Sequence, residues 1–236
     1  MNNRINDLFA RKSHDILSVY FTAGYPKPED TAAIIRLLEQ NGVDLVEIGM
    51  PFSNPTADGP VIQQSSDTAL KNGMSLELLF NQLKNIRDHV KIPLILMGYI
   101  NPVLQFGVAR FCRKCRETGI DGLILPDLPA EEYQEHFRIH FEENNLRFIP
   151  LITPQTPDER IRAIDRKTNG FIYMVSSSST TGAGKKTEDF SVEYFSRVNN
   201  LGLGNPRLIG FGISDKATFE NACRYASGAI IGSAFV

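Results

Sequence analysis

Residues 16–49 read ILSVYFTAGYPKPEDTAAIIRLLEQNGVDLVEIG and contain one complete structural unit of the chain. Two short apolar runs, 16–22 and 43–49, flank a segment whose apolar residues recur at helical spacing and which ends on Gly42. The runs are continuous rather than alternating, which is typical of parallel strands buried on both faces. The stretch therefore predicts a strand, a helix and a second, parallel strand.

Six further apolar runs, each bounded by Gly, Pro or Asp, follow along the chain. They cover residues 92–99, 120–127, 146–153, 170–177, 206–212 and 228–234. Eight strands separated by helix-like segments favour an α/β fold, a (β/α)8 TIM barrel that spans residues 1–236 as a single domain. A doubly wound open sheet is the alternative that the same pattern permits. The last run leads directly into residues 232–236, so we expect the final helix to be missing from this chain.

Composition and charge exclude two classes of protein. The 236 residues carry a net charge of -2, and Lys and Arg are spread along the chain, so no basic face is expected to bind nucleic acid. No apolar run approaches the ~18 residues of a membrane span, and the N-terminus lacks the apolar segment of a signal peptide. The sequence therefore predicts a soluble cytoplasmic protein.

Two residue pairs have spacings that metal sites use. Cys112 and Cys115 form a CxxC pair, but no second pair or suitably spaced histidine accompanies them. His136 and His140 are four residues apart on a predicted helix that covers the outside of the fold. We interpret the first pair as structural thiols and the second as part of a solvated helix face, and we expect no metal site.

In a barrel, reactive side chains lie where strands end at the carboxyl side, and Glu47 has such a position. Apolar neighbours would raise the pKa of its carboxyl group and suit it to proton transfer near neutral pH. A glutamate that forms a structural ion pair with Lys or Arg would have the same pattern. Position alone leaves both interpretations open.

Asp58 is the single acidic residue of the next loop, 49–60, which contains three prolines. The fixed φ angles of proline stiffen such a loop, which can then hold one carboxylate in place. Because Asp-Gly is also a common turn pair, Asp58 and Gly59 can alternatively be read as a simple turn.

Glycine-containing segments at 210–214 and 231–234 follow the seventh and eighth predicted strands, where barrels of this kind bind phosphate. Glycines let backbone N–H groups approach phosphate oxygens, and Ser233 adds a donor. A third such segment, 181–184, lies in the long polar stretch 176–189, whose length is typical of a lid.

The segment EIGMPFSNPTADGP, residues 47–60, strongly resembles the tryptophan synthase alpha family. Further segments resemble the family in the right order, at 97–102, 121–129, 151–160, 173–183 and 210–214, so that the resemblance covers nearly the whole chain. It implies a carbon–carbon lyase that splits indole-3-glycerol phosphate into indole and glyceraldehyde 3-phosphate. It also implies that this chain holds no cofactor, and that it pairs with a beta subunit that uses pyridoxal phosphate (PLP) in an alpha2beta2 complex.

The resemblance assigns roles to particular residues. Glu47 would transfer the proton, Asp58 would accept a hydrogen bond from the indole N1–H, Tyr173 would lie near the glycerol part, and Thr181 would belong to the lid. The phosphate would be bound by Gly182, Gly210, Gly212, Gly232 and Ser233, and the indole pocket would contain Tyr20, Met97, Ile124 and Ile152.

Three residues depart from the family pattern, namely Asn54, Thr56 and Ser179, all in the two loops near the predicted site. Two other functions are compatible with a barrel of this kind. One is a non-catalytic subunit that mainly activates its beta partner. The other is a different phosphate-binding barrel enzyme, but such enzymes usually place Lys or paired Asp at strand ends, and no Lys closes a predicted strand here.

Overall fold

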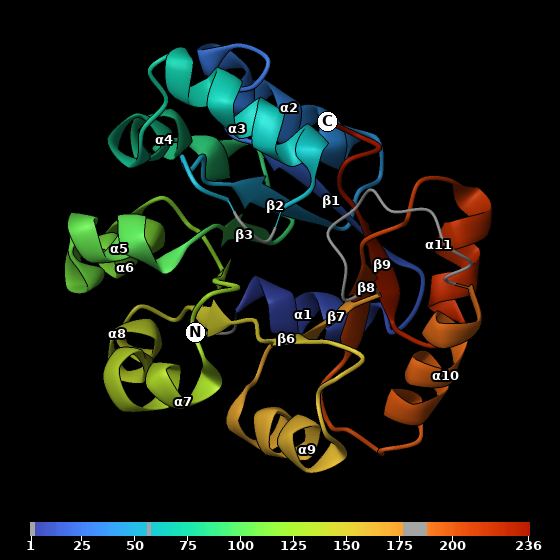
Figure 1. Cartoon of the computed structure of the whole chain (residues 1–236). Helices are drawn as coiled ribbons and strands as arrows, with labels where there is room; N and C mark the ends of the chain where they lie inside the picture. Colours follow the sequence, from blue (N-terminus) through green and yellow to red (C-terminus); the bar gives the residue numbers. More distant parts are fainter. Residues whose placement is uncertain (1–2, 56–57, 177–187) are drawn as a thin grey trace.

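The computed structural model describes residues 3–55, 58–176 and 188–236, and its strands form one curled parallel sheet (Figure 1). The strands are β1 (Ile16–Thr22), β2 (Leu45–Gly49), β3 (Leu94–Met97), β4 (Gly122–Ile124), β5 (Arg147–Phe148), β6 (Leu151–Ile152), β7 (Ile172–Val175), β8 (Arg207–Gly210) and β9 (Gly228–Ile231). Each lies within one of the eight predicted runs, and the fifth run contains both β5 and β6. The eight predicted strands are confirmed.

The sheet closes on itself between β5 and β6. Its order is β5-β4-β3-β2-β1-β9-β8-β7-β6, so these two short strands stand at opposite ends of the sheet although only two residues separate them in the chain. The Ile149 N–H donates to the Leu123 carbonyl at 2.9 Å, and the Tyr173 N–H donates to the Pro150 carbonyl at 2.9 Å. Residues 147–152 therefore act as one interrupted strand with a partner on each side. The predicted barrel is confirmed, and the open sheet is wrong.

Helices surround this ring of strands (Figure 1). The α-helices are α1 (Arg4–Arg11), α2 (Thr31–Gln40), α3 (Pro60–Lys71), α4 (Leu76–Leu83), α5 (Ile100–Phe106), α6 (Val108–Glu117), α7 (Ala130–Glu132), α8 (Arg138–Glu143), α9 (Asp158–Lys167), α10 (Glu188–Asn199) and α11 (Lys216–Cys223). Short helical turns lie at η1 (Pro28–Asp30), η2 (Ile86–Asp88) and η3 (Tyr133–Phe137). Two apolar clusters fill the space between this outer layer and the strands.

Helix α1 closes the amino-terminal end of the barrel. Its buried Ile5 and Leu8 join the cluster that fills the barrel interior, together with residues such as Ile16, Leu45 and Phe171. The preceding Asn3 caps the helix through its side chain, which accepts a hydrogen bond from the Ile5 N–H at 2.9 Å. With one end closed, the interior is open toward the carboxyl ends of the strands.

The two candidate metal pairs lie in different surroundings. Cys112 and Cys115 lie on α6 and are buried in the core, and burial raises the pKa of the Cys112 thiol to about 12. His136 is exposed on η3. Within the described residues, no group of three or more His, Cys, Asp or Glu side chains is arranged to hold a metal ion.

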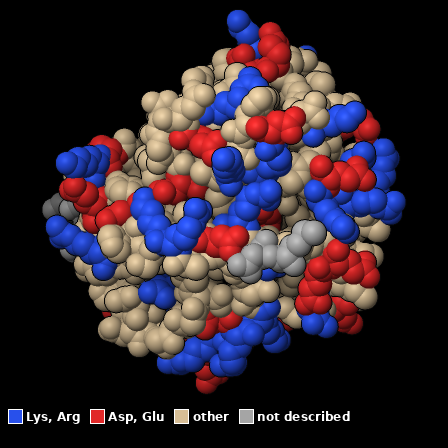
Figure 2. Space-filling view, turned by 180° about the vertical axis from the view of Figure 1, so that it is seen from behind, with Lys and Arg blue, Asp and Glu red and all other residues tan. Residues whose placement is uncertain are grey.

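On the face shown in Figure 2, basic and acidic side chains lie next to one another over most of the area. None of the described helices is both long and apolar enough to span a membrane. After β9, the described residues 232–236 form a turn in which the Phe235 N–H donates to the Gly232 carbonyl at 2.8 Å, and these five residues contain no helix.

Candidate active site

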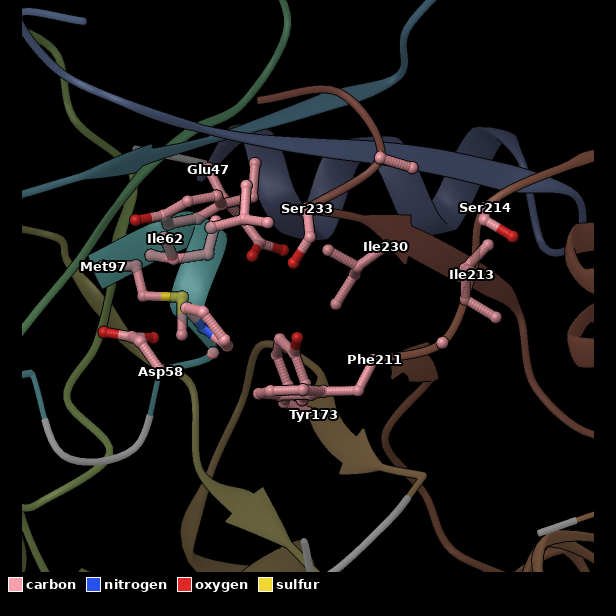
Figure 3. A pocket seen from close by; sticks show the side chains of 17 residues that line it. Glu47, Asp58, Ile62, Met97, Tyr173, Phe211, Ile213, Ser214, Ile230 and Ser233 are labelled. Carbon is pink, nitrogen blue, oxygen red and sulfur yellow. The ribbon is translucent and has the colours of Figure 1, made fainter. Parts of the chain in front are cut away.

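A cavity of about 300 Å³ lies at the carboxyl ends of the strands (Figure 3). Its walls come from segments that are distant in the sequence, and its lining residues are Tyr20, Glu47, Asp58–Ile62, Met97, Tyr173, Phe211–Ser214, Ile230 and Gly232–Ala234. Most of this lining is apolar. A flat aromatic ring therefore suits its walls, and the few polar groups determine its chemistry.

Glu47 points into the barrel because side chains alternate along β2. Val46 and Ile48 pack outward against the helices, whereas Leu45 joins the interior cluster and Glu47 shares its face. The glutamate is fully buried, and its Oε1 accepts a hydrogen bond from the Ser18 hydroxyl at 2.9 Å. Its Oε2 has no hydrogen-bond partner among the described residues.

Burial raises the pKa of Glu47 to about 8, and the Ser18 hydrogen bond partly opposes this shift. The carboxyl group therefore keeps its proton at neutral pH and can deliver it. Glu47 forms no ion pair with a described Lys or Arg, so the structural interpretation of this residue lacks support. The described environment is that of a proton donor.

Asp58 stands at the other side of the cavity mouth, directly before α3. Its Oδ2 accepts a hydrogen bond from the Tyr99 hydroxyl at 3.2 Å, and its carbonyl accepts one from the Gln63 side chain at 2.9 Å. Gly59 is the N-cap of α3 with a φ of -76° and Pro60 begins the helix, so the Asp-Gly pair leads into a helix rather than a left-handed turn. The stiff helix start and two hydrogen bonds hold Asp58 in place.

The pKa of Asp58 rises to about 6 because the group is buried, and the Tyr99 hydrogen bond lowers it in part. At neutral pH this carboxyl group is mostly ionised, while that of Glu47 is mostly protonated. Two carboxyl groups with separated pKa values can act as an acid and as an anionic acceptor at the same pH.

Two tyrosines form the cavity floor, and each lies over a glycine of the neighbouring strand. Tyr20 passes over Gly49, and Tyr173 passes over Gly210. A Cβ atom on either glycine would overlap the tyrosine hydroxyl. Gly210 was predicted to bind phosphate, but it is not among the residues that line the cavity. Its lack of a side chain instead leaves room for the Tyr173 ring.

Two of the three predicted phosphate segments, 210–214 and 231–234, contribute residues to the cavity lining. Gly212, Gly232 and Ser233, three of the residues predicted to bind phosphate, line the cavity. Phe211 and Gly212 both have positive φ angles, 70° and 75°, and the Ser176 hydroxyl donates to the Phe211 carbonyl at 2.7 Å, which holds this turn. Helix α11 begins soon afterwards, but its N-cap is Asp215, whose side chain accepts from the Thr218 N–H at 2.8 Å, so this helix start already has an anionic partner.

The predicted indole pocket is only partly present. Tyr20 and Met97 line the cavity, but Ile124 and Ile152 do not. Ile124 belongs to the interior cluster, while Ile152 packs outward among residues that contact the outer helices, because β6 turns this side chain away from the interior. The expected positions of Ile124 and Ile152 are corrected accordingly. Thr56, Ser179, Thr181 and Gly182 lie outside the described residues.

Several lining or supporting residues were not predicted, above all Ser18, Tyr99 and Ile62. Ser18 lies within an apolar run at a spacing of two from Tyr20, so the two share the inward face of β1. This spacing was the available signal. Tyr99 lies in the segment 97–102, which carried part of the family resemblance.

Comparison with known proteins gives consistent matches over the whole chain. A family model described as tryptophan synthase alpha chain matches residues 8–236. A tryptophan synthase alpha chain of Phocaeicola vulgatus is 59% identical over 234 residues, which are 99% of this chain and 91% of that relative.

Solved structures are similar as well. A tryptophan synthase alpha chain of Legionella pneumophila has a TM-score of 0.87 at 31% identity and covers 99% of this chain and 86% of its own. A chain of M. tuberculosis tryptophan synthase in an aminoacrylate-bound form has a TM-score of 0.86 at 29% identity and covers 99% of this chain and 90% of its own.

Proposed function

This chain belongs to the tryptophan synthase alpha chain family, whose members cleave indole-3-glycerol phosphate, and we propose that Glu47 and Asp58 perform that cleavage here. The chain is thus a carbon–carbon lyase of tryptophan biosynthesis that releases indole and glyceraldehyde 3-phosphate. The observation that carries the proposed roles is the separation of the two pKa values, about 8 for Glu47 and about 6 for Asp58.

The reaction requires a proton at C3 of the indole ring. Protonated Glu47 supplies it, and the ring becomes an indolenine with positive charge near N1. Ionised Asp58 accepts a hydrogen bond from N1–H and stabilises that charge. The bond between C3 and the glycerol carbon then breaks: its electrons return to the ring, and the hydroxyl proton leaves as the aldehyde forms. The Glu47 carboxylate takes up this proton, which restores the starting state.

The cavity fits the two ends of the substrate. Met97, Ile62 and Tyr20 offer apolar surface to the indole ring, and Gly212, Gly232 and Ser233 lie where the phosphate group would bind. Tyr173 also lines the cavity, and we assign the glycerol part to its neighbourhood. The steps move protons between Glu47 and the substrate and electron pairs within the substrate, so this chain needs no cofactor of its own.

The roles of the two carboxyl groups are tested with Glu47→Gln and Asp58→Asn. Each variant keeps the size of the side chain but removes either the transferable proton or the negative charge. We expect turnover of indole-3-glycerol phosphate to fall at least a hundredfold in both, while circular dichroism and unfolding show a native fold. Turnover within a few-fold of the unsubstituted chain in either variant would contradict the assignment.

We further propose that residues 1–236 work as a single barrel domain in the cytoplasm, in an alpha2beta2 complex with a PLP-containing beta subunit that consumes the indole. The family match over residues 8–236 and the similarity to a chain of M. tuberculosis tryptophan synthase support this. Light scattering of the mixed subunits measures the assembly, and turnover with and without the beta subunit measures activation. A chain that activates the beta subunit's reaction but does not itself cleave indole-3-glycerol phosphate would favour a non-catalytic role.

A further inference from the structure

Ser18 is the described residue that holds the carboxyl group of Glu47. It lies on β1, two residues before Tyr20, and is fully buried inside the barrel. Its hydroxyl donates to Oε1 of Glu47 at 2.9 Å, while Oε2 has no hydrogen-bond partner among the described residues. Figure 3 shows the Glu47 carboxylate directed into the cavity. The two oxygens of one carboxyl group therefore have different surroundings.

We propose that Ser18 is a positioning residue that keeps the transferable proton of Glu47 on Oε2, the oxygen available to the substrate. This proposal rests on the proton-transfer role proposed for Glu47. An O–H donor on Oε1 makes that atom the carbonyl oxygen of the protonated acid, so that the proton is left on Oε2. The reverse arrangement, in which Glu47 donates to Ser18, would leave the buried Ser18 O–H in need of another acceptor.

The same hydrogen bond serves both protonation states. After Glu47 has given its proton to the substrate, the Ser18 hydroxyl still donates to Oε1 and stabilises the carboxylate. No donor has to reorient during the reaction, which is the advantage of a preorganised site. Ser18 therefore limits rotation of the carboxyl group and eases the conversion of Glu47 to its charged form, without touching the substrate.

Other titratable groups near Glu47 do not take over this role. Tyr20 on β1 and Tyr173 on β7 face the same space, and burial raises the pKa of both, so they remain neutral. Asp58, in the segment before α3, is the remaining titratable group of the lining, and its recorded side-chain partner is Tyr99. Among the described residues, Ser18 alone hydrogen-bonds the Glu47 side chain.

The test is a Ser18→Ala variant studied by infrared difference spectroscopy during a pH titration. A Glu47→Gln variant identifies the C=O band of the protonated Glu47. In Ser18→Ala we expect the pKa of Glu47 to rise by roughly half a unit to one unit, because the charged form loses a donor. The band should also move to higher frequency, because Oε1 loses its hydrogen bond.

Two further variants separate this role from simple packing. Ser18→Thr keeps the hydroxyl and should restore both the pKa and the band. Ser65→Ala also removes a buried hydroxyl, one that bonds Thr22 at 2.6 Å and not Glu47, so it should leave the Glu47 titration unchanged. If Ser18→Ala does not fold, Ser18→Cys provides the same measurement, because a thiol has similar volume but is a weak donor.

Kinetics supply the second readout. We expect kcat for indole-3-glycerol phosphate to fall roughly three- to tenfold in Ser18→Ala with KM nearly unchanged, since Ser18 does not contact the substrate. The loss of activity at high pH should move upward together with the Glu47 titration. A folded Ser18→Ala with an unchanged titration and band overturns the proposal. If the Glu47 titration shifts in Ser18→Ala but the unsubstituted chain does not cleave the substrate, the proposed function is overturned. The hydrogen bond from Ser18 to Glu47 is then still supported.

Discussion

Glu47 is a single residue whose position favours chemistry at the expense of stability. The folded chain encloses its carboxyl group completely, and burial raises the pKa to about 8. In the unfolded chain the same group is in water and ionises near its ordinary pKa of 4.5. Because the two states bind different numbers of protons between these values, folding stability must depend on pH there.

The first consequence concerns Glu47→Gln, which cannot ionise. Below about pH 4.5 Glu47 is neutral in both states and costs nothing. As pH rises toward 8 the unfolded state loses the proton while the folded state keeps it, so the chain with Glu47 is progressively destabilised. We expect Glu47→Gln to match that chain near pH 4.5 and to exceed its stability by roughly a few kcal/mol at pH 8.

Urea unfolding at pH 5, 6.5 and 8 measures this difference. Asp58 is present in both proteins, so its own titration cancels in the comparison. A stability difference that is the same at all three pH values would show that the pKa of Glu47 is not raised in the folded chain.

At this scale the sequence predicted the acids but not their partners. Their places at a strand end and in a stiff loop made Glu47 and Asp58 candidates, the family resemblance assigned their roles, and both line the cavity. Ser18 and Tyr99 were missed because their contacts depend on which strands and loops become neighbours. Tyr20 is the register partner of Glu47 on the adjacent strand, and such a pairing joins residues that are far apart in the sequence.

Individual strands show a second limit of sequence patterns. The fifth apolar run was predicted as one strand. Because Pro150 has no N–H to donate, the strand is interrupted and divides into β5 and β6. The family resemblance placed Ile152, a residue of this run, in the indole pocket, whereas the alternation of β6 turns it toward the outer helices. A run that is apolar on both faces predicts a buried strand without showing which residues point inward.

Strands β7 and β8 also explain a glycine that the sequence assigned to phosphate. Because Tyr173 lies over Gly210, we expect Gly210→Ala to push the ring from its place and to lower stability by about 1–3 kcal/mol, as overpacking does. Turnover should fall as well, since Tyr173 lines the cavity. Gly204→Ala is the control, because its Cβ would meet an Asp165 oxygen at an ordinary 3.7 Å.

Thermal unfolding and turnover of the two variants decide the point. Gly204→Ala should change stability by less than about 0.5 kcal/mol. If Gly210→Ala were as stable and as active as Gly204→Ala, Tyr173 could move without cost and the glycine would have no packing role.

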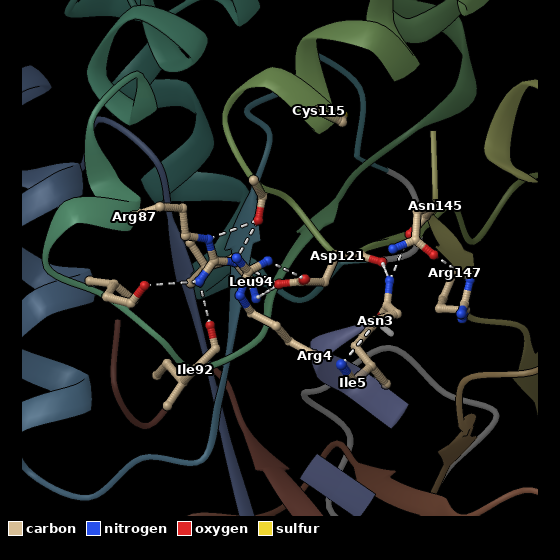
Figure 4. A network of polar contacts seen from close by, with 12 residues as sticks. Asn3, Arg4, Ile5, Arg87, Ile92, Leu94, Cys115, Asp121, Asn145 and Arg147 are labelled. Atoms are coloured by element: carbon tan, nitrogen blue, oxygen red, sulfur yellow. Dashed lines mark hydrogen bonds and ion pairs between the residues drawn. The ribbon is translucent and has the colours of Figure 1, made fainter. Parts of the chain in front are cut away.

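In the molecule as a whole, the residues of the active site and a network of polar contacts that stabilises the fold lie at opposite ends of the barrel. The cavity opens at the carboxyl ends of the strands, whereas Asp121 precedes β4 at the amino-terminal end. Figure 4 shows how Asp121 joins distant segments: its side chain accepts from Arg4 at 2.9 Å, from Arg87 at 2.6 Å and from the Leu94 N–H at 2.9 Å. Its carbonyl accepts from the Asn3 side chain at 2.8 Å.

This division predicts the behaviour of Asp121→Ala. The largely buried Arg87 guanidinium would lose its carboxylate partner and the Leu94 N–H its acceptor, so stability should fall by about 3–5 kcal/mol. Turnover per folded molecule should stay within about twofold, because the cavity is unchanged.

Asp121→Asn, which keeps an acceptor for Leu94, should lose less stability. Glu77→Ala, which removes an exposed partner of Arg110, should lose at most about 1 kcal/mol. Unfolding curves, together with kcat measured well below the unfolding transition, test this prediction. A large fall in kcat without a fall in stability would show that the two ends of the barrel are coupled.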